Sequence, residues 1–225
     1  MTPHLHHVGE RRSPVVVADD AIGDWRGVVE AAAALAPFPP AGNFYPGVRR
    51  IVEPGDGTAF TYMRALLECA APLIGGAFGV KRFDLIEASF SLVTAAPASL
   101  MPQQRAPHFD SVDPNYLALL HYLSDTPGTG TAFYRQRTTG IELIDDYNVA
   151  RFVETARAET GVPAYINATN PQFEQLVAFE GRPDRLLIYR GAMLHSGTIP
   201  PDMPLSADPR AGRLTANLFV QGFAA

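Results

Sequence analysis

Apolar residues change their spacing near residue 80. Before that point they recur at helical intervals in two segments, 20–36 and 58–74. From Phe83 the period shortens, and β-branched and aromatic residues fill short runs separated by turns. A third helix is predicted at 147–160. The short runs predict eight strands: Phe83–Thr94, Arg105–Asp110, Tyr116–Leu123, Thr131–Arg135, Gln175–Phe179, Arg185–Tyr189, His195–Ile199 and Arg213–Phe223.

Two helices followed by eight strands with long connections favour an α+β protein, mainly β, built on a β-sandwich or jelly roll. The chain has no internal repeat and no low-complexity linker, so we expect one domain over residues 1–225. Its helical support covers about 19–80 and its β core about 83–223. The second helix is expected to bend or end at Pro72. The amino terminus, with His4, His6 and His7, is expected to be an unstructured tail.

Composition narrows the class of protein further. Hydrophobic residues make up 47% of the chain and charged residues 18%, which is typical of a globular protein and excludes disorder as its main theme. No apolar run is long enough for a membrane span, and the net charge of −5 argues against nucleic acid and anionic membranes as partners. The single cysteine, Cys69, excludes an internal disulfide and fits a reducing cytoplasm.

His108 and Asp110 are the first candidates for chemistry. In a strand, residues two apart face the same side, so the imidazole and the carboxylate would point together into the sandwich. Such a pair can hold a divalent metal if another ligand converges from a different strand. Taken alone the motif is weak, because a surface or hydrogen-bonded His–Asp pair explains it equally well.

An ordered set of further motifs follows this pair. A Tyr-Leu-Ser-Asp turn leads to Gly-Thr-Ala-Phe-Tyr, His195 stands at the end of a later strand, and Arg213-Leu-Thr215 opens the last one. With this set the chain resembles the iron(II)- and 2-oxoglutarate-dependent oxygenases, particularly their prolyl-hydroxylase-like branch, over roughly residues 89–222. The loop Tyr45-Pro-Gly-Val-Arg49 also resembles an uncharacterised bacterial family of this superfamily.

The resemblance implies a double-stranded β-helix, a jelly-roll or cupin-like barrel, braced by the N-terminal helices. By it, His108, Asp110 and His195 would be the facial triad that binds Fe(II). Three protein ligands on one face leave the remaining coordination positions open, and nitrogen and oxygen ligands suit Fe(II).

The resemblance also assigns the co-substrate 2-oxoglutarate to three residues. Arg213 would pair with its distal carboxylate, since a planar guanidinium matches a carboxylate in two contacts. Thr215 would add a hydroxyl on the same face, and Tyr122 would add another donor. The spacing from His195 to Arg213 is longer than is common in the family, which leaves Arg190 as a rival anion anchor. His121 should point away from Tyr122 and be structural.

The implied protein is a cytoplasmic non-haem dioxygenase that uses dioxygen to hydroxylate an unknown small-molecule or peptide/protein substrate. Segments 136–172 and 200–211 would frame the substrate entrance. The oligomeric state stays open, with a homodimer as one option. Three alternatives remain: a non-catalytic cupin-like metal- or ligand-binding module, a cupin enzyme that uses zinc or another metal, and a purely structural jelly roll.

Overall fold

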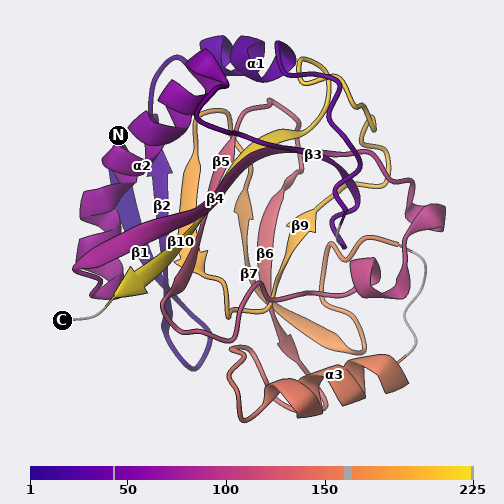
Figure 1. The fold of residues 1–225 in the computed structure, drawn as a ribbon. Coiled ribbons are helices and arrows are strands. Elements are labelled where there is room, and N and C mark those ends of the chain that lie inside the picture. The colour runs from indigo at the N-terminus through magenta and orange to yellow at the C-terminus, as the bar shows by residue number, and fades with distance from the viewer. Residues whose placement is uncertain (43, 160–163, 224–225) are drawn as a thin grey trace.

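Two antiparallel sheets lie face to face in the computed structural model of the chain, which describes residues 1–42, 44–159 and 164–223 (Figure 1). The larger sheet has the strand order β1-β2-β8-β5-β10-β4-β3, and the smaller has the order β7-β6-β9. The strands are β1 (Thr2–Val8), β2 (Ser13–Asp19), β3 (Gly47–Ile51), β4 (Arg82–Val93), β5 (Tyr116–Tyr122), β6 (Gly130–Gln136), β7 (Phe173–Glu180), β8 (Leu186–Arg190), β9 (His195–Thr198) and β10 (Leu214–Phe223). The described residues also contain three α-helices: α1 (Trp25–Ala33), α2 (Gly57–Phe78) and α3 (Val149–Ala158). The predicted mainly β class is confirmed.

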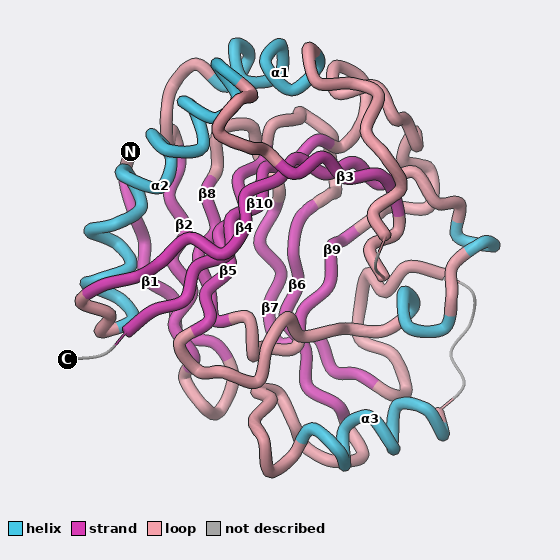
Figure 2. Tube along the Cα trace, viewed as in Figure 1, coloured by secondary structure: helices cyan, strands magenta, loops and turns pink. Residues whose placement is uncertain are grey.

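The helices cover the outer faces of the two sheets (Figure 2). α1 and α2 pack on the larger sheet through a core that includes Leu66, Ile74 and Leu119. α3 packs on the smaller sheet, where Phe152 meets Tyr134. A third cluster fills part of the space between the sheets.

Alternation along the central strands decides which side chains enter that space. In β10 the even-numbered residues from Leu214 to Val220 are buried among the helix-facing core. Thr215, Asn217 and Phe219 therefore face the other way, into the space between the sheets. In β5 the same alternation sends His121 toward α2 and Tyr122 between the sheets.

The amino-terminal prediction is wrong in two respects. His4, His6 and His7 lie in β1, which pairs along its length with β2 at the edge of the larger sheet. The helix expected at 20–36 begins only at Trp25, because Asp24 caps it by accepting a hydrogen bond from the backbone nitrogen of Gly27 at 3.0 Å. β1 is almost entirely exposed, so its sequence carries no alternation that would have marked it as a strand.

Three further segments differ from expectation. The expected strand Arg105–Asp110 is absent, since a 3-10 helix occupies Pro102–Arg105 and only one bridge follows, between His108 and His195. α2 continues through Pro72 to Phe78 and is closed by Gly79 in the left-handed region, with φ +67°. Residues 47–49 of the expected loop Tyr45–Arg49 form the beginning of β3. No helix among the described residues is both long enough and apolar enough to cross a membrane.

Candidate metal centre and anion pocket

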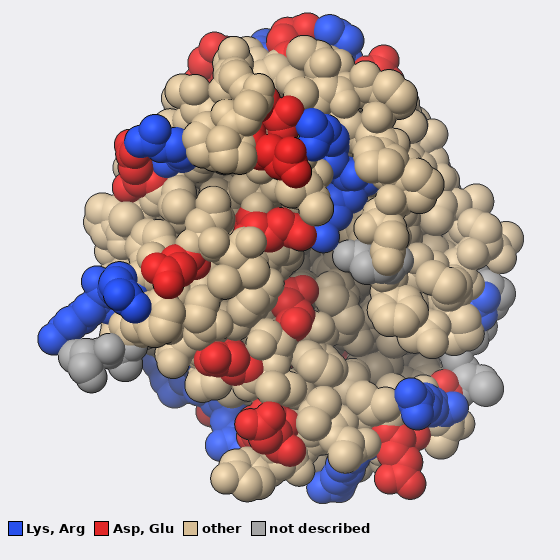
Figure 3. Space-filling view, viewed as in Figure 1, with Lys and Arg blue, Asp and Glu red and all other residues tan. Residues whose placement is uncertain are grey.

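A cavity of about 510 Å³ opens between the two sheets. Its walls come from β4 and β10 of the larger sheet, from β6 and β9 of the smaller one, and from the segments around residues 45 and 108. Figure 3 shows the surface hollowed near its centre, with acidic and basic side chains beside the opening. Candidate residues from distant parts of the sequence meet in this cavity.

His108, Asp110 and His195 converge on one wall, each with a ligand atom within 4.8 Å of the others. Nε2 of His108 lies 3.8 Å from Asp110 Oδ1, and Nε2 of His195 lies 3.7 Å from Asp110 Oδ2. Backbone bonds fix this arrangement, because His108 and His195 exchange two N–H···O bonds of 2.8 Å and the Asp110 nitrogen donates to Gly191 O at 2.7 Å. The predicted same-side geometry of residues 108 and 110 therefore arises from a short bridge.

The protonation of His195 is set by its hydrogen bond. Nδ1 of His195 lies 2.8 Å from the carbonyl oxygen of Met193 and must donate to it, which leaves the lone pair of a neutral ring on Nε2. Burial lowers the pKa of His195 to about 4, so the ring stays neutral at ordinary pH. Its free Nε2 faces Asp110.

One carboxylate oxygen of Asp110 is buried without a hydrogen-bond donor in the described part of the chain, although the side chain as a whole keeps 16% of its surface exposed. Oδ2 has no partner among the described residues. Burial raises the pKa of Asp110 to about 6, against the opposing positive potential of His108 and Arg49. A carboxylate whose two oxygens each face an imidazole nitrogen, at distances too long for hydrogen bonds, is a donor set that fits a divalent transition metal.

Arg213 forms a second polar centre in the same cavity. It is 4% exposed, yet no carboxylate among the described residues pairs with it. One terminal nitrogen donates to Gly130 O at 2.8 Å, and the buried Nε has no partner. Because a buried, unpaired cation is costly, this arrangement suits an anionic ligand. Thr215, on the same face of β10, is buried beside it at the cavity wall.

The other predicted residues are placed differently. Tyr122 lies under Arg213, with its ring centroid 5.7 Å from the guanidinium carbon, but its hydroxyl is bonded to Thr131 at 2.7 Å and it does not line the cavity. Arg190 lies outside the cavity, over the ring of Phe78. Arg190 is thus no rival to Arg213.

His121 serves the core on the opposite face of β5. Its Nε2 donates to Asp184 Oδ1 at 3.0 Å, and its Nδ1 lies 2.7 Å from the hydroxyl of Tyr62 on α2. Asp184 also accepts hydrogen bonds from the backbone nitrogens of Ile22 and Gly23. Burial raises the pKa of Asp184, but the hydrogen bonds from His121 and the two backbone nitrogens outweigh burial and hold this pKa below its usual value.

Three residues of the Tyr45–Arg49 segment line the cavity, namely Tyr45, Pro46 and Arg49, and the sequence assigned a role to none of them. The Tyr45 hydroxyl is buried near Thr215, Ser91 and Arg213; burial raises its pKa, while these neighbours lower it. Arg49 reaches the cavity from β3 and forms an ion pair with Glu87. The motif itself was the available signal, but its position depends on β3 joining β4 at the edge of the larger sheet.

The expected frame of the entrance is mostly wrong. The lining residues include none from 200–211 and, from the described part of 136–172, only Tyr165. Met203 packs instead against Val93 and Tyr165 in a separate apolar cluster. Phe44, Ile86 and the 3-10 helix residues Gln103 and Gln104 line the cavity in their place.

The sequence matches the model of a family of unknown function (DUF6445) over residues 1–220. Among curated proteins, none is significantly similar to it.

Several solved structures share the fold. HygX from Streptomyces hygroscopicus, with nickel and 2-oxoglutarate bound, aligns with a TM-score of 0.55 and 16% identity, covering 93% of this chain and 83% of HygX. SnoN, a non-haem α-ketoglutarate-dependent epimerase from nogalamycin biosynthesis, aligns with a TM-score of 0.55 and 14% identity, covering 94% and 79%. A collagen prolyl hydroxylase of Paramecium bursaria Chlorella virus-1 aligns with a TM-score of 0.53 and 10% identity, covering 99% and 96%. The fold is therefore the one found in these iron- and 2-oxoglutarate-dependent enzymes.

Proposed function

We propose that this chain, which belongs to the DUF6445 family of unknown function, is a non-haem iron(II)- and 2-oxoglutarate-dependent oxygenase formed by a single domain. One observation carries the proposal: two imidazoles and a carboxylate with one buried, unpaired oxygen share a cavity with a buried arginine that has no carboxylate partner among the described residues. The likeness to HygX, SnoN and the viral hydroxylase supports it.

His108, Asp110 and His195 would hold the iron. The Met193 carbonyl fixes the ring of His195 so that its free nitrogen faces Asp110, and the backbone bridge between residues 108 and 195 holds the two rings side by side. A cation here would also give Oδ2 of Asp110 the positively charged partner that it lacks among the described residues. The ring of His108 is 55% exposed and faces the cavity, so a ligand can reach the centre from that side.

Arg213, Thr215 and Tyr45 would bind the distal carboxylate of 2-oxoglutarate. The guanidinium is held by Gly130 and backed by the ring of Tyr122, which leaves its unpaired edge for the anion. Tyr122 acts through Thr131, which it orients by a hydrogen bond. These contacts would orient the co-substrate, and the surrounding apolar walls limit access of water.

Iron(II) and 2-oxoglutarate, when bound, supply the oxidising chemistry: dioxygen and 2-oxoglutarate become succinate and carbon dioxide as a substrate C–H bond becomes C–OH. The cavity volume suits a small molecule or one side chain of a peptide. The non-catalytic cupin-like module remains the alternative, because it would keep the metal ligands without turnover.

Succinate formation distinguishes the oxygenase from the non-catalytic binding module. The protein is incubated aerobically with iron(II), 2-oxoglutarate and a small-metabolite extract as a source of substrate. We expect succinate above the level without iron, and none above that level for His195→Ala. If wild type forms no succinate although it binds both iron and 2-oxoglutarate, the oxygenase proposal is refuted and the binding module replaces it.

A further inference from the structure

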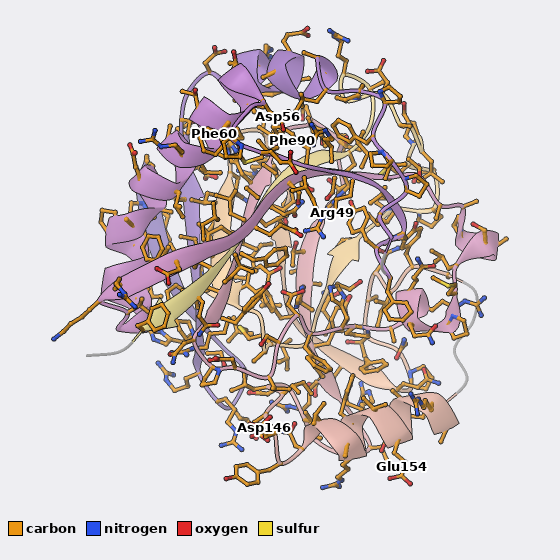
Figure 4. The ribbon with its side chains drawn as sticks, viewed as in Figure 1. Arg49, Asp56, Phe60, Phe90, Asp146 and Glu154 are labelled. Atoms are coloured by element: carbon orange, nitrogen blue, oxygen red, sulfur yellow. The ribbon has the colours of Figure 1, made fainter. Side chains whose placement is uncertain are left out.

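A second guanidinium lines the cavity nearer its rim. Arg49 stands opposite Ser91 in the β3–β4 pair and projects toward the space between the sheets (Figure 4). Its Nε donates to Ser89 Oγ at 3.0 Å, and one terminal nitrogen forms an ion pair with Glu87. The two side chains keep 14% and 28% of their surface exposed, so a ligand in the cavity can touch both.

Arg49 and Glu87 each keep a polar atom that is free to bind a ligand. The second terminal nitrogen of Arg49 and the second carboxylate oxygen of Glu87 make no hydrogen bond with another described residue. The pair therefore presents one donor edge and one acceptor edge next to each other. A purely anionic ligand at Arg49 would lie beside the Glu87 carboxylate, and a purely cationic ligand at Glu87 would lie beside the guanidinium, so either is disfavoured.

An aromatic surface connects the pair to the metal ligands. Phe219 lies under Arg49, with 5.7 Å between its ring centroid and the guanidinium carbon, and stacks on Tyr116 at 5.6 Å. Tyr116 in turn lies beside Asp110, and both occupy space that a side chain at residue 191 would fill: a Cβ on Gly191 would come within 2.8 Å of Tyr116 and 3.1 Å of Asp110. Two stacked rings, those of Phe219 and Tyr116, thus span the distance from Arg49 to the candidate metal centre. A small substrate could bind along them.

The charges in a site that holds iron(II) and 2-oxoglutarate also favour a substrate without net charge. An iron(II) ion, the Asp110 carboxylate, dianionic 2-oxoglutarate and the Arg213 guanidinium cancel one another, and so do Arg49 and Glu87. A substrate without net charge leaves that balance intact.

We propose that Arg49 and Glu87 bind the carboxylate and the ammonium group of a zwitterionic substrate, a free α-amino acid, whose side chain lies along Phe219 and Tyr116 toward His108 and Asp110. The inference rests on the proposed function, because it takes these ligands as the reacting centre. It adds the substrate class and the two residues that select it.

Binding to the inert nickel form tests the proposal without turnover. The protein is loaded with Ni(II) and 2-oxoglutarate, and 2-oxoglutarate binding is measured first by calorimetry. The standard L-amino acids, their N-acetyl derivatives and their primary amides are then titrated. We expect at least one free amino acid to bind, and to bind roughly 10- to 100-fold more tightly than its acetyl and amide derivatives, each of which lacks one charge.

Two variants assign the charges to residues. Arg49→Gln should abolish the discrimination against the amide, and Glu87→Gln should abolish the discrimination against the acetyl derivative. Arg210→Gln, which breaks an exposed ion pair with Glu30 at the surface, is the matched control and should bind like wild type. The inference is overturned if 2-oxoglutarate binds but no free amino acid does, or if the derivatives bind as well. If 2-oxoglutarate itself does not bind, the proposed function fails and the inference with it.

Discussion

Oδ2 of Asp110 lies 3.7 Å from Nε2 of His195, and no described group donates a hydrogen bond to this buried oxygen. Two acceptors that face each other at this distance repel unless a cation lies between them. Without a metal, this contact therefore lowers the stability of the folded protein.

Removing the negative charge of Asp110 should therefore stabilise the metal-free protein. We expect Asp110→Asn to raise its free energy of unfolding by about 1–3 kcal/mol at pH 8, where the wild-type carboxyl is ionised, as measured by urea unfolding. The variant should lose the stabilisation that Ni(II) gives wild type. The exposed Asp202→Asn control should change neither quantity. An Asp110→Asn protein that is no more stable and still responds to Ni(II) would exclude the metal centre.

Tyr45 should contribute to 2-oxoglutarate binding where Tyr122 does not. Tyr45→Phe removes a hydroxyl at the Arg213–Thr215 wall, so we expect the dissociation constant for 2-oxoglutarate to rise by about tenfold in the Ni(II)-loaded protein. Pyruvate keeps the chelating end but lacks the distal carboxylate, and its affinity should stay unchanged. Equal weakening of both ligands would show that Tyr45 acts on the metal ligands or the fold instead.

Gly47 allows β3 to approach β4. A Cβ at this residue would lie 2.0 Å from the carbonyl oxygen of Leu92, so Gly47→Ala must displace the strand that carries Arg49. We expect a loss of about 1–3 kcal/mol in the free energy of unfolding. Gly55→Ala, which has open space around the added methyl, is the control and should cost far less. Equal stability of the two variants would contradict the close β3–β4 contact.

Asp184 should make stability depend on acidic pH. Its folded-state pKa lies below the usual 3.8, so its contribution is fully present above pH 3.8 and is lost as the pH falls through the lower folded value. We expect Asp184→Asn to be less stable than wild type near neutral pH by about 1–3 kcal/mol, with a difference that shrinks below pH 3.8. The exposed Asp146→Asn control, at the surface near α3 in Figure 4, should follow wild type at every pH. A difference that stays constant with pH would show that the Asp184 pKa is not lowered.

The sequence predicts the central strands well and the edge strands poorly. β5 is a nearly continuous run of buried residues and β10 alternates between buried and partly exposed ones, so their apolar residues mark both as strands. β1 is held by backbone pairing alone at an exposed edge, and nothing in Thr2–Val8 distinguishes it from a tail.

The candidate metal ligands could be predicted together because two of them are two residues apart and the third ends a strand. The positions of Tyr45 and Arg49 could not be predicted from the sequence, because they depend on β3 pairing with β4, a contact between residues about 40 apart in the chain. The family resemblance assigns Tyr122 to the co-substrate, and its side chain does face the space between the sheets. Its hydroxyl is bonded to Thr131 on the facing sheet, however, and Tyr122 does not line the cavity.

The proposed function requires that one cavity hold iron(II) and 2-oxoglutarate together. An anaerobic titration tests it most directly: the metal-free protein is loaded with iron(II), 2-oxoglutarate is added, and the visible metal-to-ligand charge-transfer band of the chelate is followed. We expect a band in wild type, no band in His195→Ala, and a band that needs more 2-oxoglutarate in Arg213→Ala. Iron binding without any band in wild type would contradict it.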